Sequence, residues 1–166
     1  MEVINKRRSV REFLSTPISK KVLEQLLRAA MQAPSAKNQQ PWRFIVVTKP
    51  ADLEKIADFS PSFKMLKTAP AAILLLIDHS NLTAPTMAIQ DMAAATENIL
   101  LEATAQGLGS CWLGVYGRPE RMEAIRDFFQ LSPSIEPFSA VALGYPIKKE
   151  VFSFVDRFDS NRVTWM

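Results

Sequence analysis

Apolar residues recur at three- and four-residue spacing in residues 19–33, the pattern of an amphipathic helix. The apolar positions of this stretch are Val22, Leu23, Leu26, Leu27, Ala30 and Met31. Ser19 is suited to cap the first turn, and Pro34 lies just beyond the last periodic residue. The pattern therefore predicts a helix with one buried face.

Residues 85–106 predict the longest helix, which Pro85 opens and Gly107 and Gly109 close. Its apolar positions cover most of the circumference, so we expect burial on several sides. Many of these positions are alanines, which let another helix approach closely. We therefore expect a central helix, in the core or at a subunit interface.

Shorter patterns complete the outline. The remaining predicted helices cover residues 2–7, 50–59 and 118–129, and the predicted strands cover 42–48, 71–77, 138–146 and, as strand or loop, 109–116. Helices and strands mix without strict alternation, which indicates an α+β or mixed α/β fold. The polar tail, 147–166, carries spaced aromatic residues, typical of a segment that docks onto another surface.

The bulk composition narrows the class of protein. A chain of 166 residues with 48% hydrophobic and 22% charged residues predicts one folded domain over residues 1–166. Cys111 is the single cysteine, so no internal disulfide forms. The start, MEVINKRRSV, lacks a signal-peptide core, and the apolar run 69–77 is less than half a membrane span. These features predict a cytoplasmic protein without a membrane partner.

The charge is uneven along the chain. Residues 1–49 hold ten Lys/Arg against three Asp/Glu, whereas residues 50–166 hold ten against fourteen. The basic end suits a small anionic ligand or a nucleic acid, but the acidic remainder argues against a surface devoted to nucleic acid. His79 is the single histidine, which argues against a His/Cys metal site. A catalytic triad would have to use it, and a surface histidine at a strand end is the alternative.

The basic stretch NKRRSVREF is the first candidate site. Arg7 and Arg8, with the hydroxyl of Ser9, form a plausible phosphate clamp because guanidinium binds phosphate oxygens bidentately. Arg11 would sit further along the same ligand. A solvated basic turn is the alternative interpretation.

If residues 9–13 are extended, their side chains alternate between two sides. Ser9, Arg11 and Phe13 then share one side, and Val10 and Glu12 share the other. This alternation predicts that Arg11 and Phe13 face the same way.

The loop PSAKNQQPW is the second candidate. Pro34 and Pro41 bound it, and Ser35, Asn38 and Gln40 offer neutral donors and acceptors. A heteroaromatic ring with carbonyls and ring nitrogens needs such partners. An ordinary polar turn is the alternative.

Two further stretches complete the candidates. The glycines of GLGSCWLG, residues 107–114, allow backbone to approach a flat ligand, although their spacing does not match a dinucleotide fingerprint. Cys111 within it is more typical of a buried small residue than of a nucleophile. Arg157 could fold back as another phosphate ligand or be solvated.

Several segments, taken together and in order, resemble the FMN-dependent nitroreductase family. They are RRSVREF, APSAKNQQPWRFIVV, QDMAAATENILLEATAQGLGSCWLGV, ALGYP and a tail with Lys148, Lys149 and Arg157. The resemblance covers almost the whole chain. It implies an α+β fold: a three-layer α-β-α sandwich with a mixed, mostly antiparallel sheet, in a domain-intertwined homodimer with FMN at the interface. It also implies a short member, whose brief segment 78–86 leaves the pocket open.

The resemblance assigns cofactor-binding roles residue by residue and implies no catalytic side chain and no metal. The phosphate and ribityl ligands would be Arg7, Arg8, Ser9 and Arg157. The residues at the ring would be Arg11, near the N1/O2 edge, and the backbone of Leu113 and Gly114. The residues contributed by the partner subunit would be Pro34, Ser35, Ala36, Asn38 and Gln40.

The resemblance further implies ping-pong transfer of hydride from NADH or NADPH through FMN to an electron-poor acceptor, such as a nitroaromatic or a quinone. Arg11 would stabilise charge that develops at the ring edge. Two other functions stay open at this point. One is a flavin-binding sensor or storage protein without turnover, and the other is a nucleic-acid contact through the basic N-terminus.

Overall fold

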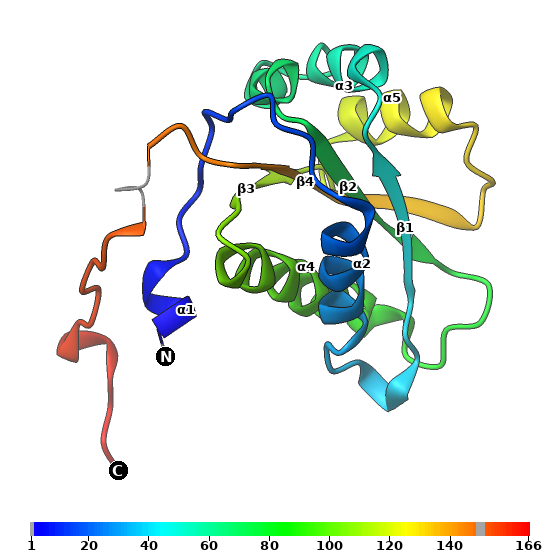
Figure 1. Cartoon of the computed structure of the whole chain (residues 1–166). Helices are drawn as coiled ribbons and strands as arrows, with labels where there is room; N and C mark the ends of the chain where they lie inside the picture. The colour runs from blue at the N-terminus through cyan, green and yellow to red at the C-terminus, as the bar shows by residue number, and fades with distance from the viewer. Residues whose placement is uncertain (1, 149–151) are drawn as a thin grey trace.

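A four-stranded sheet forms the centre of the computed structural model, which describes residues 2–148 and 152–166 (Figure 1). Its strands are β1 (Trp42–Val47), β2 (Ala71–Asp78), β3 (Gly109–Gly114) and β4 (Ile135–Gly144), in the order β1-β2-β4-β3. All four predicted strands are confirmed, and β4 begins three residues earlier than predicted. All three strand pairs are antiparallel. The parallel component of the expected mixed sheet is an isolated bridge between Ser9 and Ser110.

The helices follow the predicted outline. The α-helices are α1 (Glu2–Lys6), α2 (Lys20–Met31), α3 (Pro50–Ala57), α4 (Ala88–Ala105) and α5 (Pro119–Phe129). The predicted cap of α2 is confirmed, because the Ser19 hydroxyl accepts a hydrogen bond from the Val22 amide at 3.3 Å. The short 3₁₀ segments are η1 (Ala36–Asn38), η2 (Pro61–Lys67), η3 (Pro85–Met87) and η5 (Ser160–Arg162). The sequence pattern did not predict η2, and the turn at Pro85 is η3, ahead of α4.

Strand β2 shows how the layers arise. Ile73, Leu75 and Ile77 pack in the core under α2 and α4, whereas Ala72 and Leu74 pack in the core under α3, η2 and α5. Figure 1 shows α2 and α4 on one face of the sheet and α3 and α5 on the other. The expected three-layer α-β-α sandwich is therefore confirmed. It accounts for the apolar run Ala71–Ile77 of β2, because a strand covered on both faces has no solvent side.

The N-terminal segment crosses the end of the sheet and differs from its prediction. Val10 and Phe13 are both 4% exposed and belong to the same core, whereas Arg11 is exposed. The predicted alternation, with Arg11 and Phe13 on one side, is therefore wrong. The segment docks at two separate bridges, Ser9 to Ser110 and Phe13 to Pro146, so no continuous strand imposes a two-residue period.

Two glycines make room for this docking. A Cβ atom on Gly109 would lie 2.8 Å from Cβ of Val10, and one on Gly144 would lie 2.8 Å from Cβ of Phe13. Such contacts are closer than any packed core allows. The glycines at the ends of β3 and β4 therefore hold the arginine-bearing segment against the sheet.

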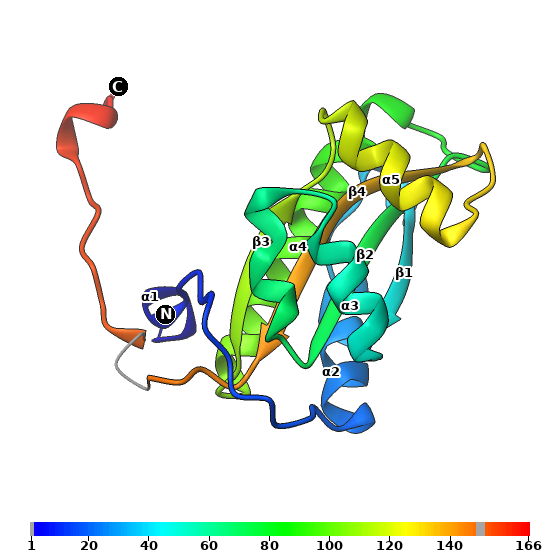
Figure 2. The ribbon, with the colours of Figure 1, turned by 90° about the horizontal axis from the view of Figure 1, so that it is seen from above.

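The tail leaves the sandwich. Residues 152–166 run beside α1 and away from the sheet in both views (Figures 1 and 2). Phe154, Phe158 and Trp165 are 61%, 76% and 89% exposed. Within one chain, the tail therefore leaves these three aromatic residues uncovered. Lys149 lies outside the described residues. In the part of the chain described here, no helix is long and apolar enough to cross a membrane.

Candidate functional site

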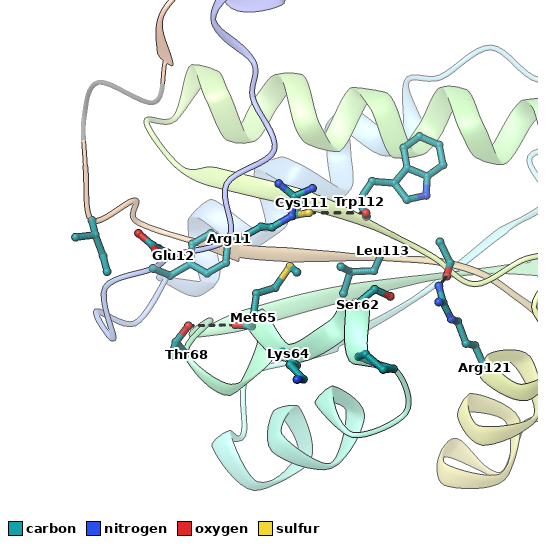
Figure 3. A pocket seen from close by; sticks show the side chains of 14 residues that line it. Arg11, Glu12, Ser62, Lys64, Met65, Thr68, Cys111, Trp112, Leu113 and Arg121 are labelled. Carbon is teal, nitrogen blue, oxygen red and sulfur yellow. Dashed lines mark hydrogen bonds between the residues drawn. The ribbon is translucent and has the colours of Figure 1, made fainter.

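A cavity of about 980 Å³ opens between the N-terminal segment, η2, β3 and the start of α5 (Figure 3). Its charged and polar lining residues are Arg11, Glu12, Ser62, Lys64, Thr68 and Arg121. Its apolar side includes Phe13, Met65, Trp112 and Leu113. The cavity thus joins apolar surface suited to a flat ring with several charged groups.

Three of the predicted site residues meet at this cavity. Arg11 enters from the N-terminal segment, and Leu113 and Gly114 enter from the end of β3. Because β3 is an edge strand, one side of its backbone is free to face a ligand. A Cβ atom on Gly114 would meet no other atom of the described chain within 4 Å. Glycine here therefore leaves the backbone accessible.

Cys111 also borders the cavity, but it has the properties of a structural residue. It is 3% exposed, and burial raises the pKa of its thiol, while the nearby Arg11 acts in the opposite direction. A raised pKa disfavours the thiolate that nucleophilic chemistry needs. His79 is also remote from this cavity: it is exposed at the end of β2 and lies 2.9 Å from the Glu136 carboxylate.

A second cavity, of about 370 Å³, lies between α1 and residues 154–158 of the tail. Arg7, Arg8 and Arg157 line it, so the tail arginine lies beside the N-terminal pair. Three arginines against one acid, Asp156, give this cavity a net positive lining, which favours an anion. Ser9 does not line this cavity. It lies between the two cavities, where it bridges to β3.

Both N-terminal arginines also have partners within the chain. The Arg7 Nε lies 3.1 Å from the Glu97 carboxylate on α4. The Arg8 guanidinium donates to the carbonyls of Asn5 at 3.0 Å and Arg7 at 2.6 Å, and to the carbonyl of Ser153 in the tail. These bonds hold α1, α4 and the tail together around the second cavity.

The two cavities lie along one extended segment. Arg8 lines the second cavity and Arg11 lines the first. Three residues of extended chain span about 10 Å. A ligand with an anionic group at one end and a flat ring at the other can therefore follow the segment.

The predicted loop residues lie elsewhere in the same chain. None of Pro34, Ser35, Ala36, Asn38 and Gln40 lines either cavity. The loop sits at the far ends of α2 and β1, beside the start of α4 (Figure 1). Within one subunit, the structure therefore does not bring these residues to the arginines.

The polar groups of this loop bond largely to one another. The backbone amide of Gln40 donates to the Ser35 hydroxyl at 3.1 Å, and the side-chain amide of Gln40 donates to the side-chain oxygen of Asn38 at 2.9 Å. Lys37, Asn38 and Gln40 have positive φ angles of 52°, 54° and 47°. Left-handed backbone costs about 1 kcal/mol or more at each such residue, so the surroundings must enforce the loop shape.

Asp91 in the first turn of α4 supplies much of that enforcement. It is 5% exposed, and its carboxylate accepts the Ala36 amide at 2.9 Å and the Gln39 side chain at 2.6 Å. Gln39 bonds in turn to Ala84, accepting its amide at 2.9 Å and donating to its carbonyl at 3.0 Å. Sequence reasoning missed Asp91, although an acid beside the apolar run Met92–Ala95 was an available signal.

We expect Asp91→Asn to lower the free energy of unfolding by about 1–3 kcal/mol, because one loop donor loses a charged acceptor. Urea denaturation measures the change. Asp127→Asn is the matched control, since Asp127 is exposed on α5, and it should shift stability by less than about 0.5 kcal/mol. Equal stability of the two variants would show that Asp91 does not hold the loop.

Sequence reasoning also missed Lys64 and Arg121 at the first cavity. Lys64 belongs to η2, which the pattern did not predict. Arg121 belongs to a helix whose sequence looks like an ordinary amphipathic one. Only the folding of η2 and α5 over the same face of the sheet brings them beside Arg11.

The sequence and the fold of this α-β-α sandwich both match one family of known proteins. Residues 4–63 and 60–145 match the model of the nitroreductase family. The chain therefore belongs to the nitroreductase family, and it is an oxidoreductase.

Similar proteins support this placement. The chain is 44% identical over 165 residues to "Putative NADH dehydrogenase/NAD(P)H nitroreductase" of Archaeoglobus fulgidus, covering 98% of this chain and 95% of that protein. It is 47% identical to the solved "Putative NADH Oxidase" of Clostridium acetobutylicum, with a TM-score of 0.95 over 98% and 97% of the two chains. An "FMN-dependent Nitroreductase" of Clostridium difficile is 27% identical, with a TM-score of 0.89 over 99% and 97%.

Proposed function

We propose that the chain acts as one FMN-binding domain over residues 1–166, in the cytoplasm, and transfers hydride from NADH or NADPH to an electron-poor acceptor. A nitroaromatic or a quinone fits this description. The convergence of arginines on two cavities along one extended segment carries the proposal. The FMN dependence named for the Clostridium difficile relative supports it.

The residues present fit FMN. The three arginines that line the second cavity outnumber its one acid, Asp156, and suit a dianionic phosphate. A larger, partly apolar cavity follows within the reach of a ribityl chain, and its glycine backbone is open. In this proposal Arg7, Arg8, Ser9 and Arg157 hold the phosphate and ribityl chain, and Arg11, Leu113 and Gly114 border the ring.

Bound FMN would accept hydride from the nicotinamide and pass it to the acceptor. The protein would contribute position and charge rather than a proton donor. Arg11 would place a cation near the N1/O2 edge of the bound ring and would stabilise negative charge that gathers there. The buried Cys111 and the remote His79 agree with chemistry that uses no side-chain acid or base.

A homodimer would complete the site. The five loop residues lie away from both cavities of their own chain. We therefore place the loop of the partner subunit beside these cavities. The aromatic tail, exposed in one chain, would cover the partner and intertwine the two subunits. Burial of side chains such as Phe158 and Trp165 would then stabilise the dimer.

Reconstitution with FMN tests this function. The purified protein should bind one FMN per subunit, and initial rates at varied NADH and varied acceptor should give parallel double-reciprocal lines. A protein that remains colourless with excess FMN would contradict the proposal. A yellow protein that completes only one turnover would instead favour a flavin-binding sensor or storage role.

A further inference from the structure

Arg121 occupies an unusual place in the first cavity. From the first turn of α5, its Nη1 donates to the carbonyl of Gly114 at 2.6 Å. Its guanidinium carbon lies 5.2 Å from the centre of the Phe63 ring, and 19% of the side chain is exposed. Figure 3 shows the side chain reaching from α5 toward the end of β3. The charged group is thus held in a defined position beside the proposed ring site.

Among the described residues, the guanidinium makes a single hydrogen bond, to the Gly114 carbonyl, so most of its donors are unused. Arginine offers five N–H groups, and its Nε here is buried without a hydrogen-bond partner among the described residues. The nearest carboxylate, on Glu120, lies 3.9 Å away and is 66% exposed, so water weakens its attraction. A partly desolvated cation with free donors favours an anion from solution.

The charge of the lining residues also favours an anion in the first cavity. Arg11, Lys64 and Arg121 line it, and Glu12 is the acid among the described lining residues. Arg11 belongs to the proposed ring site, which leaves Lys64 and Arg121 as cations for another group. The cavity therefore attracts negatively charged molecules.

We propose that Arg121 recognises an anionic oxygen group on the electron acceptor. The preferred acceptors are then nitroaromatics or quinones that carry a carboxylate or a similar anion. This inference rests on the proposed function and adds the substrate class. The phosphates of the nucleotide donor share this chemistry, so the test must separate donor from acceptor.

The test compares 4-nitrobenzoate with 4-nitrobenzamide, which differ in charge but little in shape. Binding to the FMN-loaded protein is measured without nucleotide, and kcat/KM is measured with NADH. Arg121→Gln should weaken binding of the acid, and lower its kcat/KM, by roughly 10- to 100-fold. The same change should alter both values for the amide by less than about threefold.

Two matched variants complete the design. Arg121→Lys keeps a cation and should retain most of the preference for the acid. Arg118→Gln removes an exposed arginine at the N-terminus of α5 that does not line the cavity, and it should behave as wild type.

If Arg121→Gln lowered affinity and kcat/KM equally for the acid and the amide, the inference would be overturned. Equal losses would show that Arg121 only supports the backbone at Gly114. An effect confined to the KM for NADH would also overturn it, in favour of the nucleotide phosphates. FMN binding and reduction of the neutral amide by the wild-type protein report separately on the proposed function. Failure of the inference is thereby distinguished from failure of that function.

Discussion

Replacing Gly144 with alanine is expected to lower the free energy of unfolding by about 3 kcal/mol, the upper part of the usual range for overpacking. The new Cβ would lie 2.8 Å from Cβ of Phe13 and 2.8 Å from Cδ of Pro70. Phe13 is buried, so it cannot turn into solvent without a further loss. Urea denaturation followed by circular dichroism measures the change.

The same substitution should weaken FMN binding, because relief of the clash lifts the N-terminal segment from β4 and displaces Arg11. Gly114→Ala is the matched variant that separates the loss of stability from the loss of FMN affinity. Its Cβ would meet no atom of the described chain within 4 Å, so stability should stay within about 0.5 kcal/mol of wild type. The added methyl would nevertheless narrow the approach to the proposed ring. If Gly144→Ala proved as stable as Gly114→Ala, the docking described for the segment would be incorrect.

Arg8→Ala is expected to weaken FMN binding by about 1.5–3 kcal/mol, roughly 10- to 100-fold in Kd, the scale of hydrogen bonds to charged groups. Arg8 lines the second cavity with Arg7 and Arg157 and also donates to the tail at Ser153. Its loss removes a phosphate ligand and loosens the tail beside it. Fluorescence titration of FMN into the apoprotein measures the affinity.

Arg118→Ala is the control, because it removes an exposed arginine that lines neither cavity. It should leave the FMN affinity unchanged. Unchanged affinity in both Arg7→Ala and Arg8→Ala would contradict the assignment of the phosphate site. The paired Arg7 should show the smaller effect, because Glu97 already offsets part of its charge.

The sequence was sufficient for most elements of the fold because their signals are local. The helical period of residues 19–33, the apolar run of β2 and the proline and glycine boundaries of the long helix all act within a few residues. Prediction was wrong for residues 9–13, where contacts with β3 and β4, distant in sequence, decide which side chains are buried. Side chains alternate between the two faces of a sheet only where the strand pairs with its neighbour without interruption.

The candidate site could be predicted only in part for the same reason. RRSVR is a compact basic motif, so its arginines are visible as anion ligands without a structure. Arg121, Lys64 and Asp91 carry no local signal of comparable strength, and each depends on packing between distant elements. The proposed placement of the loop beside a second subunit would depend on assembly, which no local pattern specifies.

In the proposed dimer, FMN lies between the arginine segment of one subunit and loop 34–41 of the other. Subunit complementation tests it directly. One chain carries Arg8→Ala and Arg11→Ala, and the other carries Ala36→Glu, which places an acid in the loop. Each homodimer should bind little FMN, because both of its sites contain a defect.

The heterodimer, isolated with two different affinity tags, unites one intact segment with one intact loop. The account predicts that it binds about one FMN per dimer, half the wild-type content, and regains about half of the NADH oxidation rate. A heterodimer that binds no more FMN than the two defective homodimers would contradict the account, because each site would then lie within a single chain.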